Sequence, residues 1–385
     1  MIKNLIAPLL SLVILIAGSG LFNTCVPLRL EIEHYDPEVI GAIVSSMYVG
    51  LLIGSFKIAR WISKVGHVRS FMTFAMALGG LVLLLTLWVN PWYWAFIRFF
   101  GGICMAGVFI VIESWMLMQA TTENRGVMLS LYLAALYGAL SLGQFLINLA
   151  DPSSMWPLMI VALCCFLSVI PMLGKKTQAP KIEEPAKVSL GRLFTLSPLG
   201  FTGGIVSGMI LAVVHGLIPV YAKEIGLSVA EIGNLMAVII FGGLSLQWPI
   251  GRLADRGRRR AMIQLASFLA ALFGMAITWL PAGSSLSLLF LAWIFGGFSF
   301  TIYPLSMAYT CERVQDNQIM EATGGFVLSY GIGAIVGPLL APLCMDYVGP
   351  NGLFYFLAAI SLFLGIVSLK PREAKSTVPV KNEEK

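Results

Sequence analysis

Two charged side chains, Arg98 and Glu113, lie well inside long apolar stretches of the chain. A charge at the centre of a bilayer costs about 2.5–3.5 kcal/mol on insertion scales, so such residues are expected to have a function. Burial makes the ionised form of a carboxylic acid costly, so a water path that opens and closes could load and unload a proton. Glu113 is therefore a candidate for proton coupling. The alternative is an ion pair with Arg60, Arg69 or Arg125.

Arg98 and Glu113 are 15 residues apart on one predicted helix (113 − 98). A rotation of 100° per residue places them about 60° apart around the axis, and the helical rise places them about 22 Å apart along it. They share a face but cannot pair directly. Arg98 could hold an anionic group or tune the proton affinity of an acid. The alternative is that it caps backbone carbonyls between helices.

Asn23 and His215 are polar residues in two other apolar stretches, 192 residues apart (215 − 23). Histidine titrates near neutral pH, so His215 is a candidate for proton coupling and for substrate binding, with Asn23 as a second substrate-binding residue. The alternative for His215 is a neutral imidazole that a neighbouring helix satisfies. Further aromatic and amide side chains offer ring faces and hydrogen bonds to a substrate, although each could equally serve helix packing: Tyr48, Tyr132, Tyr137, Gln144, Gln247, Tyr303 and Tyr330.

The sequence has none of the motifs of an enzyme or of an ATP-driven pump. We find no phosphate-binding loop, nucleophile elbow or His-Glu-x-x-His pattern, so we expect no catalytic residue and no cofactor. The six cysteines lie in or at the ends of apolar runs without ligand-like spacing, which indicates small buried residues and no metal site.

The composition indicates that a lipid bilayer is the solvent, because 58% of the residues are hydrophobic and only 11% are charged. In lipid each span must satisfy its own backbone, so the spans are expected to be helices of about 20 residues. Polar, Pro and Gly clusters divide the chain into twelve predicted spans: 5–28, 38–61, 70–90, 92–118, 126–149, 155–174, 197–221, 229–253, 260–281, 285–310, 319–345 and 351–370.

Most of the 25 basic residues fall on the cytoplasmic side if the N-terminus is cytoplasmic. We therefore expect both termini in the cytoplasm and the protein in a bacterial inner membrane. This distribution of charge reads as a topology signal, so nucleic acid is not an expected partner.

The second half of the chain repeats the first. Pro27 and Pro219 are 192 residues apart, and the segments 100–102 and 295–297 both read Phe-Gly-Gly at an offset of 195. Duplicated hydrophobic halves are typical of transporters that rock one repeat against the other around a central site. We predict an all-α membrane protein with two pseudo-symmetric six-helix bundles. Its parts are a first bundle over 1–174, a cytoplasmic linker over 175–196 with a short helix near 190–194, a second bundle over 197–370 and a disordered tail over 371–385.

Residues 251–256 read Gly-Arg-Leu-Ala-Asp-Arg, followed by further arginines, and resemble the loop signature of the major facilitator superfamily. A degenerate copy occupies residues 59–69, with Ser63 at the aspartate position. In that family this signature helps to close the cytoplasmic side, with Asp255 and Arg256 as the expected pair. The positions that the resemblance assigns to this cytoplasmic gate motif are Ser63, Gly66, Arg69, Gly251, Asp255 and Arg256.

Other segments extend the resemblance over the whole chain. Residues 98–102 resemble the arginine and glycine signature of the fourth span, 331–338 resembles the glycine-rich stretch of antiporters, and Glu113-Ser114-Trp115 resembles the YcaD-like subgroup. The resemblance implies a twelve-helix major facilitator fold in which spans one, four, seven and ten line a central cavity.

The function that we expect is proton-coupled secondary transport of a small, fairly apolar or amphipathic organic molecule by alternating access, with efflux preferred. A proton-coupled importer, a uniporter of a metabolite and a lipid translocase remain alternatives, as does a non-transporting receptor or scaffold. The expected partners are a small-molecule substrate, protons and membrane lipids, and the chain is expected to be a monomer.

Overall fold

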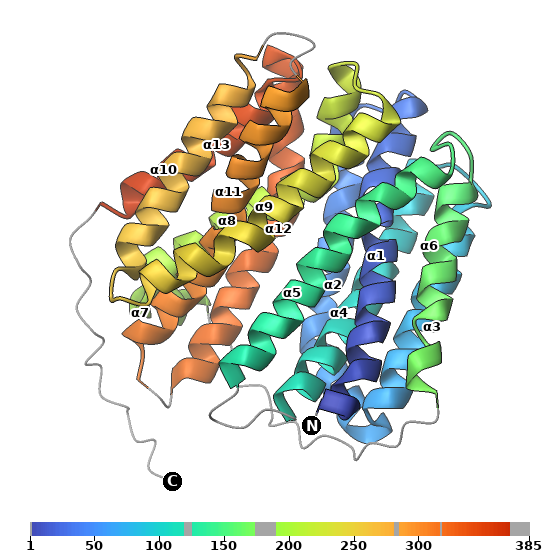
Figure 1. Ribbon diagram of the computed structural model, residues 1–385, viewed down its shortest axis with the longest axis horizontal. Helices are drawn as coiled ribbons and strands as arrows, with labels where there is room; N and C mark the ends of the chain where they lie inside the picture. Colours follow the sequence, from blue (N-terminus) through green and yellow to red (C-terminus); the bar gives the residue numbers. More distant parts are fainter. Residues whose placement is uncertain (1, 119–124, 174–189, 281–284, 316–317, 370–385) are drawn as a thin grey trace.

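The computed structural model describes residues 2–118, 125–173, 190–280, 285–315 and 318–369, and all regular secondary structure in these ranges is helical. The helices form two groups, with α5 and α9 beside each other where the groups meet (Figure 1). The N-half comprises α1 (Ile2–Ile32), α2 (Pro37–Val65), α3 (His67–Leu85), α4 (Pro91–Met118), α5 (Arg125–Gly143), η1 (Gln144–Leu149), α6 (Trp156–Leu167) and η2 (Ile170–Met172). After the short helix α7 (Leu190–Leu196), the C-half comprises α8 (Pro198–Glu224), α9 (Val229–Ala254), α10 (Arg259–Ile277), α11 (Ser285–Arg313), α12 (Ile319–Val348) and α13 (Gly352–Val367).

Ten helices within the described residues are long and apolar enough to cross a membrane. Two shorter apolar segments, Trp156–Met172 and Gly352–Val367, lie where the sixth and last spans are predicted. The start of α1 and the end of α6 lie at the same end of the N-half (Figure 1), as an even number of crossings requires. The predicted linker helix is present as α7, where Arg192 pairs with Glu321 of α12 at 3.2 Å. Most of the predicted linker, 175–189, and the tail 371–385 lie outside the described residues.

Glycines bring the backbones of the inner helices together in the same way in both halves. A Cβ on Gly50 of α2 would overlap the Phe99 carbonyl of α4, and a Cβ on Gly242 of α9 would overlap the Trp293 carbonyl of α11. Each glycine is therefore required for the close approach of its helix pair. Gly242 lies 192 residues after Gly50, whereas Trp293 lies 194 residues after Phe99. The offset is therefore 192 between α2 and α9 and 194 between α4 and α11, and the second value is one residue less than the Phe-Gly-Gly match indicated.

The two halves meet near the end of the molecule at which α2 begins, and we call this the latched end. A Cβ on Gly41 of α2 would overlap the Pro338 carbonyl of α12. A Cβ on Gly233 of α9 would lie against the Gln144 carbonyl, where α5 passes into η1. Gly233 is 192 residues after Gly41, and Pro338 is 194 after Gln144. The two contacts are therefore equivalent under the internal repeat.

Two hydrogen bonds across the halves obey the same symmetry. The Ser45 hydroxyl of α2 donates to the Ile335 carbonyl of α12 at 2.8 Å, and the Ser141 hydroxyl of α5 donates to the Ala237 carbonyl of α9 at 2.9 Å. Ala237 lies 192 residues after Ser45, and Ile335 lies 194 after Ser141. We call these two bonds the serine latch. Both donors belong to the N-half and both acceptors to the C-half.

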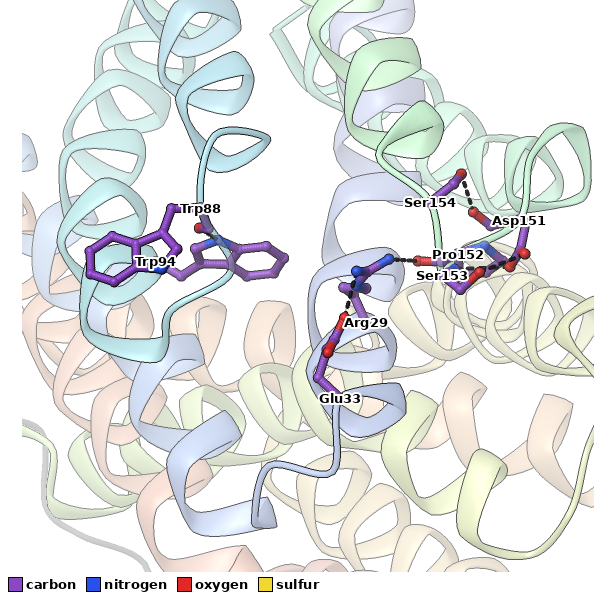
Figure 2. Close-up of polar contacts among 8 residues, drawn as sticks. All are labelled: Arg29, Glu33, Trp88, Trp94, Asp151, Pro152, Ser153 and Ser154. Carbon is purple, nitrogen blue, oxygen red and sulfur yellow. Dashed lines mark hydrogen bonds and ion pairs between the residues drawn. The ribbon is translucent and has the colours of Figure 1, made fainter.

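At the same end, Arg29 ties the last turn of α1 to the loop between η1 and α6. Its guanidinium bonds to Glu33 at 2.5 Å and to the Pro152 carbonyl at 3.4 Å (Figure 2). Asp151 folds this loop by accepting from the backbone and the hydroxyl of Ser153 at 2.9 and 2.6 Å. Arg29 therefore braces the N-half from within.

Candidate functional site

Arg98 is a buried cation with unused hydrogen-bond donors. It lies on α4 with 3% of its surface exposed, and its Cζ is 4.8 Å from the centroid of the Phe22 ring on α1. Its Nε and Nη1 atoms have no partner among the described residues, and no described carboxylate forms an ion pair with it. The Tyr48 side chain of α2 lies within electrostatic reach. The alternative that Arg98 caps helix carbonyls through these two atoms is therefore not what the described structure shows.

An aromatic bridge joins the two halves next to His215. The Tyr137 ring of α5 packs edge-on against Phe300 of α11 with centroids 5.6 Å apart, and Phe300 packs in the same way against His215 of α8, also at 5.6 Å. On α11 and α12, Tyr303 and Tyr330 make a further edge-on pair at 5.1 Å. Tyr137 therefore packs across the boundary between the halves, and Tyr303 and Tyr330 lie within electrostatic range of it. Sequence reasoning did not single out Phe300, because an apolar residue on an apolar helix carries no signal of its own.

His215 presents one unused ring nitrogen. Its Nδ1 lies 2.7 Å from the Leu211 carbonyl, so in the neutral ring Nδ1 carries the proton and Nε2 is an acceptor. The buried Nε2 has no partner among the described residues. The neighbouring helix that was to satisfy this imidazole supplies only a ring contact, from Phe300. His215 is therefore free to accept a hydrogen bond or a proton.

Prolines add backbone acceptors at the two repeat-related polar positions. Pro27 and Pro219 lie inside α1 and α8 and lack the N–H that would bond to the carbonyl four residues earlier. Those carbonyls belong to Asn23 and His215. The half-buried Asn23 amide also has no described partner. Both positions therefore offer a polar side chain and a carbonyl released from its helix.

Glu113 has an exposed side chain on α4 and interacts electrostatically with Tyr132 of α5 and Tyr303 of α11. Because Tyr303 belongs to the C-half, this carboxylate faces the other half. Neither Arg60 nor Arg69 pairs with it among the described residues, and the Arg125 side chain lies outside them.

The two residues after Glu113 have a different task. The Ser114 hydroxyl lies 2.9 Å from Nε2 of His67, at the start of α3, and the Trp115 ring packs on the His67 ring with centroids 5.7 Å apart. Within the Glu-Ser-Trp triplet, Ser114 and Trp115 therefore fix α4 to α3. Glu113 is left to interact with the C-half. Sequence reasoning missed His67, although its place beside the gate motif was visible.

The two predicted amides differ in their surroundings. Gln144 is fully buried and used on both sides: Thr24 donates to its Oε1 at 2.5 Å, and its Nε2 donates to the Gly20 carbonyl at 3.1 Å. It therefore joins α1 to the end of α5. Gln247 of α9 is half-buried and makes no hydrogen bond that the described residues show.

The gate motif of the C-half is built around Arg259 at the start of α10. Arg259 bonds to Asp255 at 3.0 Å, to Glu312 of α11 at 2.8 Å and to the Ala308 carbonyl at 3.2 Å. The expected partner of Asp255, Arg256, is exposed. Arg259 takes its place because the turn between α9 and α10 brings it back beside Asp255, where it also reaches Glu312 of α11.

The remaining positions of the gate motif have looser surroundings. A Cβ on Gly251 would meet nothing within 4 Å, so no close helix approach requires this glycine. In the N-half, Ser63 bonds back to the Arg60 carbonyl at 2.8 Å, Gly66 turns the chain at φ 88°, and Arg69 is exposed.

The sequence model described as Major Facilitator Superfamily matches residues 9–202 and again 200–385, once for each half. The chain belongs to the major facilitator superfamily. It is similar to the "Uncharacterized MFS-type transporter YcaD" of Escherichia fergusonii, with 32% identity over 361 residues and 93% of both chains covered. The YcaD protein of Shigella flexneri serotype 5b is 31% identical over 365 residues, again with 93% of both chains covered. The chain is therefore a membrane transporter of this family and not an enzyme.

Solved structures of the same fold are more distant in sequence. The nucleoside transporter NupG gives a TM-score of 0.77 at 14% identity, covering 96% of this chain and 98% of that one. The D-xylose-proton symporter gives 0.76 at 13% identity, covering 96% and 97%. At this identity the likeness concerns the fold alone.

Proposed function

We propose that this chain is a proton-coupled secondary transporter of a small amphipathic organic molecule, which works by alternating access. The observation that carries the proposal is the position of two titratable side chains, Glu113 and His215, on the facing surfaces of two latched halves. Glu113 interacts electrostatically with Tyr303 of the C-half, and His215 packs on Phe300, which in turn packs on Tyr137 of the N-half. Movement of one half against the other must therefore change the surroundings of both.

In this proposal Glu113 carries the proton. Its side chain has exposed surface and interacts electrostatically with Tyr303 of the C-half, and in this proposal water reaches the carboxylate from between the halves. When the halves close over it, the carboxylate loses that water and holds its proton more readily. Arg98 adjusts this balance from about 22 Å away on the same helix, while Asn23 and His215 border the substrate.

The orientation follows from the basic residues, which favour a cytoplasmic N-terminus. The latched end is then the outer end in a bacterial inner membrane, and the described arrangement faces inwards. Export is the preferred direction of transport. Import, uniport and lipid translocation are the alternatives, and the transport experiments described next distinguish them from export.

A thermal-shift screen of purified protein against metabolites, drugs and lipids, repeated across pH, selects a ligand. Transport of that ligand into liposomes is then measured with and without an imposed pH gradient. We expect the gradient to drive transport in the wild type and Glu113→Gln to abolish the response to the gradient while leaving counterflow. Asp36→Asn is the matched control, because Asp36 is an exposed carboxylate at the start of α2 without a side-chain capping bond.

Two results would overturn this proposal. If Glu113→Gln kept gradient-driven transport at the wild-type rate, Glu113 would not be the proton carrier. If the wild type showed no counterflow with any ligand that it binds, the chain would be a receptor or scaffold. The sign of the pH gradient that drives accumulation separates export from import, and scrambling of labelled lipids reveals a translocase.

A further inference from the structure

We propose that the substrate is an organic anion with an apolar body, whose carboxylate-like group pairs with Arg98. This inference rests on the proposed transport function and names the chemical class of the substrate. It starts from the positive charge of Arg98, which is buried in the membrane span Pro91–Met116 and has no carboxylate partner among the described residues.

The surroundings of Arg98 compensate its charge incompletely. The Phe22 ring supplies a cation–π contact at 4.8 Å, and Tyr48 supplies a neutral phenol nearby. Two guanidinium donors, Nε and Nη1, bond to nothing that is described. A desolvated guanidinium without a carboxylate partner is unusual in a bilayer, where such charges pair or serve a pathway. A bound anion would complete the pair and leave again with the transport cycle.

The chemistry of these two donors favours an anionic oxygen as their partner. The Nε–H and Nη1–H groups point in different directions, so each can donate one charge-assisted hydrogen bond to a carboxylate-like oxygen. Glu113, the other charged residue inside the same span, lies too far along the helix to fill this role. The acid that pairs with Arg98 must therefore come from outside the described residues.

The side chains that connect Arg98 to the C-half define the rest of the ligand. Tyr48 lies within electrostatic range of both Arg98 and Tyr330 of α12, and the Tyr330 ring packs on Tyr303. Beyond them Tyr137, Phe300 and His215 form the aromatic bridge. These side chains offer ring faces and uncharged polar groups. They suit an apolar or aromatic body that carries one charge at one end.

The depth of these residues is consistent with a single site. Arg98 lies seven residues from the start of α4, and Tyr48 lies eleven residues from the start of α2, where both helices begin at the latched end. At 1.5 Å per residue these positions are about 10 and 16 Å from that end. An anion bound to Arg98 would therefore sit against the closed end, with its body pointing towards the opposite end.

The probe is a matched series of aryl-alkyl carboxylates with their uncharged amides, together with a long-chain fatty acid to separate a metabolite from a lipid. Binding to the purified full-length chain is measured by tryptophan fluorescence and thermal shift. We expect carboxylates to bind about ten- to hundredfold more tightly than the amides, since bonds to a charged group are worth that much. Arg98→Gln should remove this preference and leave amide binding unchanged. Arg29→Gln, which changes an arginine at the latched end, should keep it.

Equal affinity of the wild type for carboxylates and amides, or no binding of any carboxylate, would overturn this inference whether or not Arg98→Gln folds. Preference for anions that survives in Arg98→Gln would also overturn it. A chain that binds carboxylates selectively but never transports them sinks the transport proposal and leaves this assignment standing. A chain that transports the amides as well as the acids supports the transport proposal and overturns the assignment of an organic anion as the substrate.

Discussion

Removal of the serine latch should open the latched end. The change is the double variant Ser45→Ala and Ser141→Ala, which deletes the hydrogen bonds to the Ile335 and Ala237 carbonyls. Both acceptors are backbone carbonyls of helices, so they keep their own helical bonds when the serines are removed. No buried group is left unsatisfied, and the loss is that of the bonds themselves.

The magnitude follows from the value of such bonds in membranes. Hydrogen bonds between transmembrane helices average about 0.6 kcal/mol. The two bonds lie on separate helix pairs, so their contributions should add to about 1.2 kcal/mol. This corresponds to about an eightfold shift in the ratio of closed to open protein, with RT about 0.59 kcal/mol. Each single variant should give about a threefold shift.

The assay is a distance distribution between spin labels at positions 36 and 347. Asp36 precedes α2 of the N-half, and Tyr347 lies near the end of α12 with 90% of its surface exposed, so labels there should be tolerated. We expect the double variant to gain a population at longer distance. The matched control is Ser46→Ala, because the Ser46 hydroxyl bonds back to Ile43 within its own helix. An unchanged distribution in the double variant, or an equal shift in Ser46→Ala, would refute the reasoning.

Three further changes test other parts of the structure. Gly41→Ala should oppose closure of the latched end by about 1–3 kcal/mol, because its Cβ would overlap the Pro338 carbonyl. The distance between the same two spin labels measures this opening, and a wild-type distance distribution would contradict the close approach. Arg259→Gln removes two ion pairs with exposed carboxylates and should lower the stability of the purified protein by no more than about 1 kcal/mol for each pair; thermal unfolding measures this, and an unchanged midpoint would show that the pairs do not contribute. Hydrogen bonds from Ser153 hold the pKa of Asp151 below its usual value. The loop that they fold is therefore favoured above that usual value and loses this support as the pH falls through the lowered one. The protection of residues 150–156 against hydrogen exchange, relative to the intrinsic exchange rate at each pH, should therefore fall in acid, and protection that does not change with pH would argue against it.

Much of the architecture could be predicted from the sequence. Spans were visible because lipid demands long apolar helices, and the repeat was visible because equivalent helices need the same small residues, as at Gly41 and Gly233. The family followed from the loop signature and was confirmed by the match to both halves. Arg98 and Glu113 stood out because a charge is conspicuous in an apolar stretch. These features depend on composition and on spacing along one helix.

Other features depend on how helices far apart in the chain are rotated against each other. The sequence suggested Arg256 as the partner of Asp255, but the turn after α9 directs Arg259 towards α11 instead. Gln144 could not be distinguished from a ligand contact until Thr24 and Gly20 were found around it.

The serine latch likewise could not be predicted from the sequence. Ser45 and Ser141 are ordinary helix residues in the sequence, and their partners are carbonyls, which every residue possesses. Only the packing of α2 on α12 and of α5 on α9 selects which carbonyls lie within reach. The sequence by itself determined the spans, the duplication and the family, because these follow from local spacing and from the demands of lipid. The tertiary structure alone decided at which end the serine latch joins the halves, which side chains lie between them and which buried charge has no partner among the described residues.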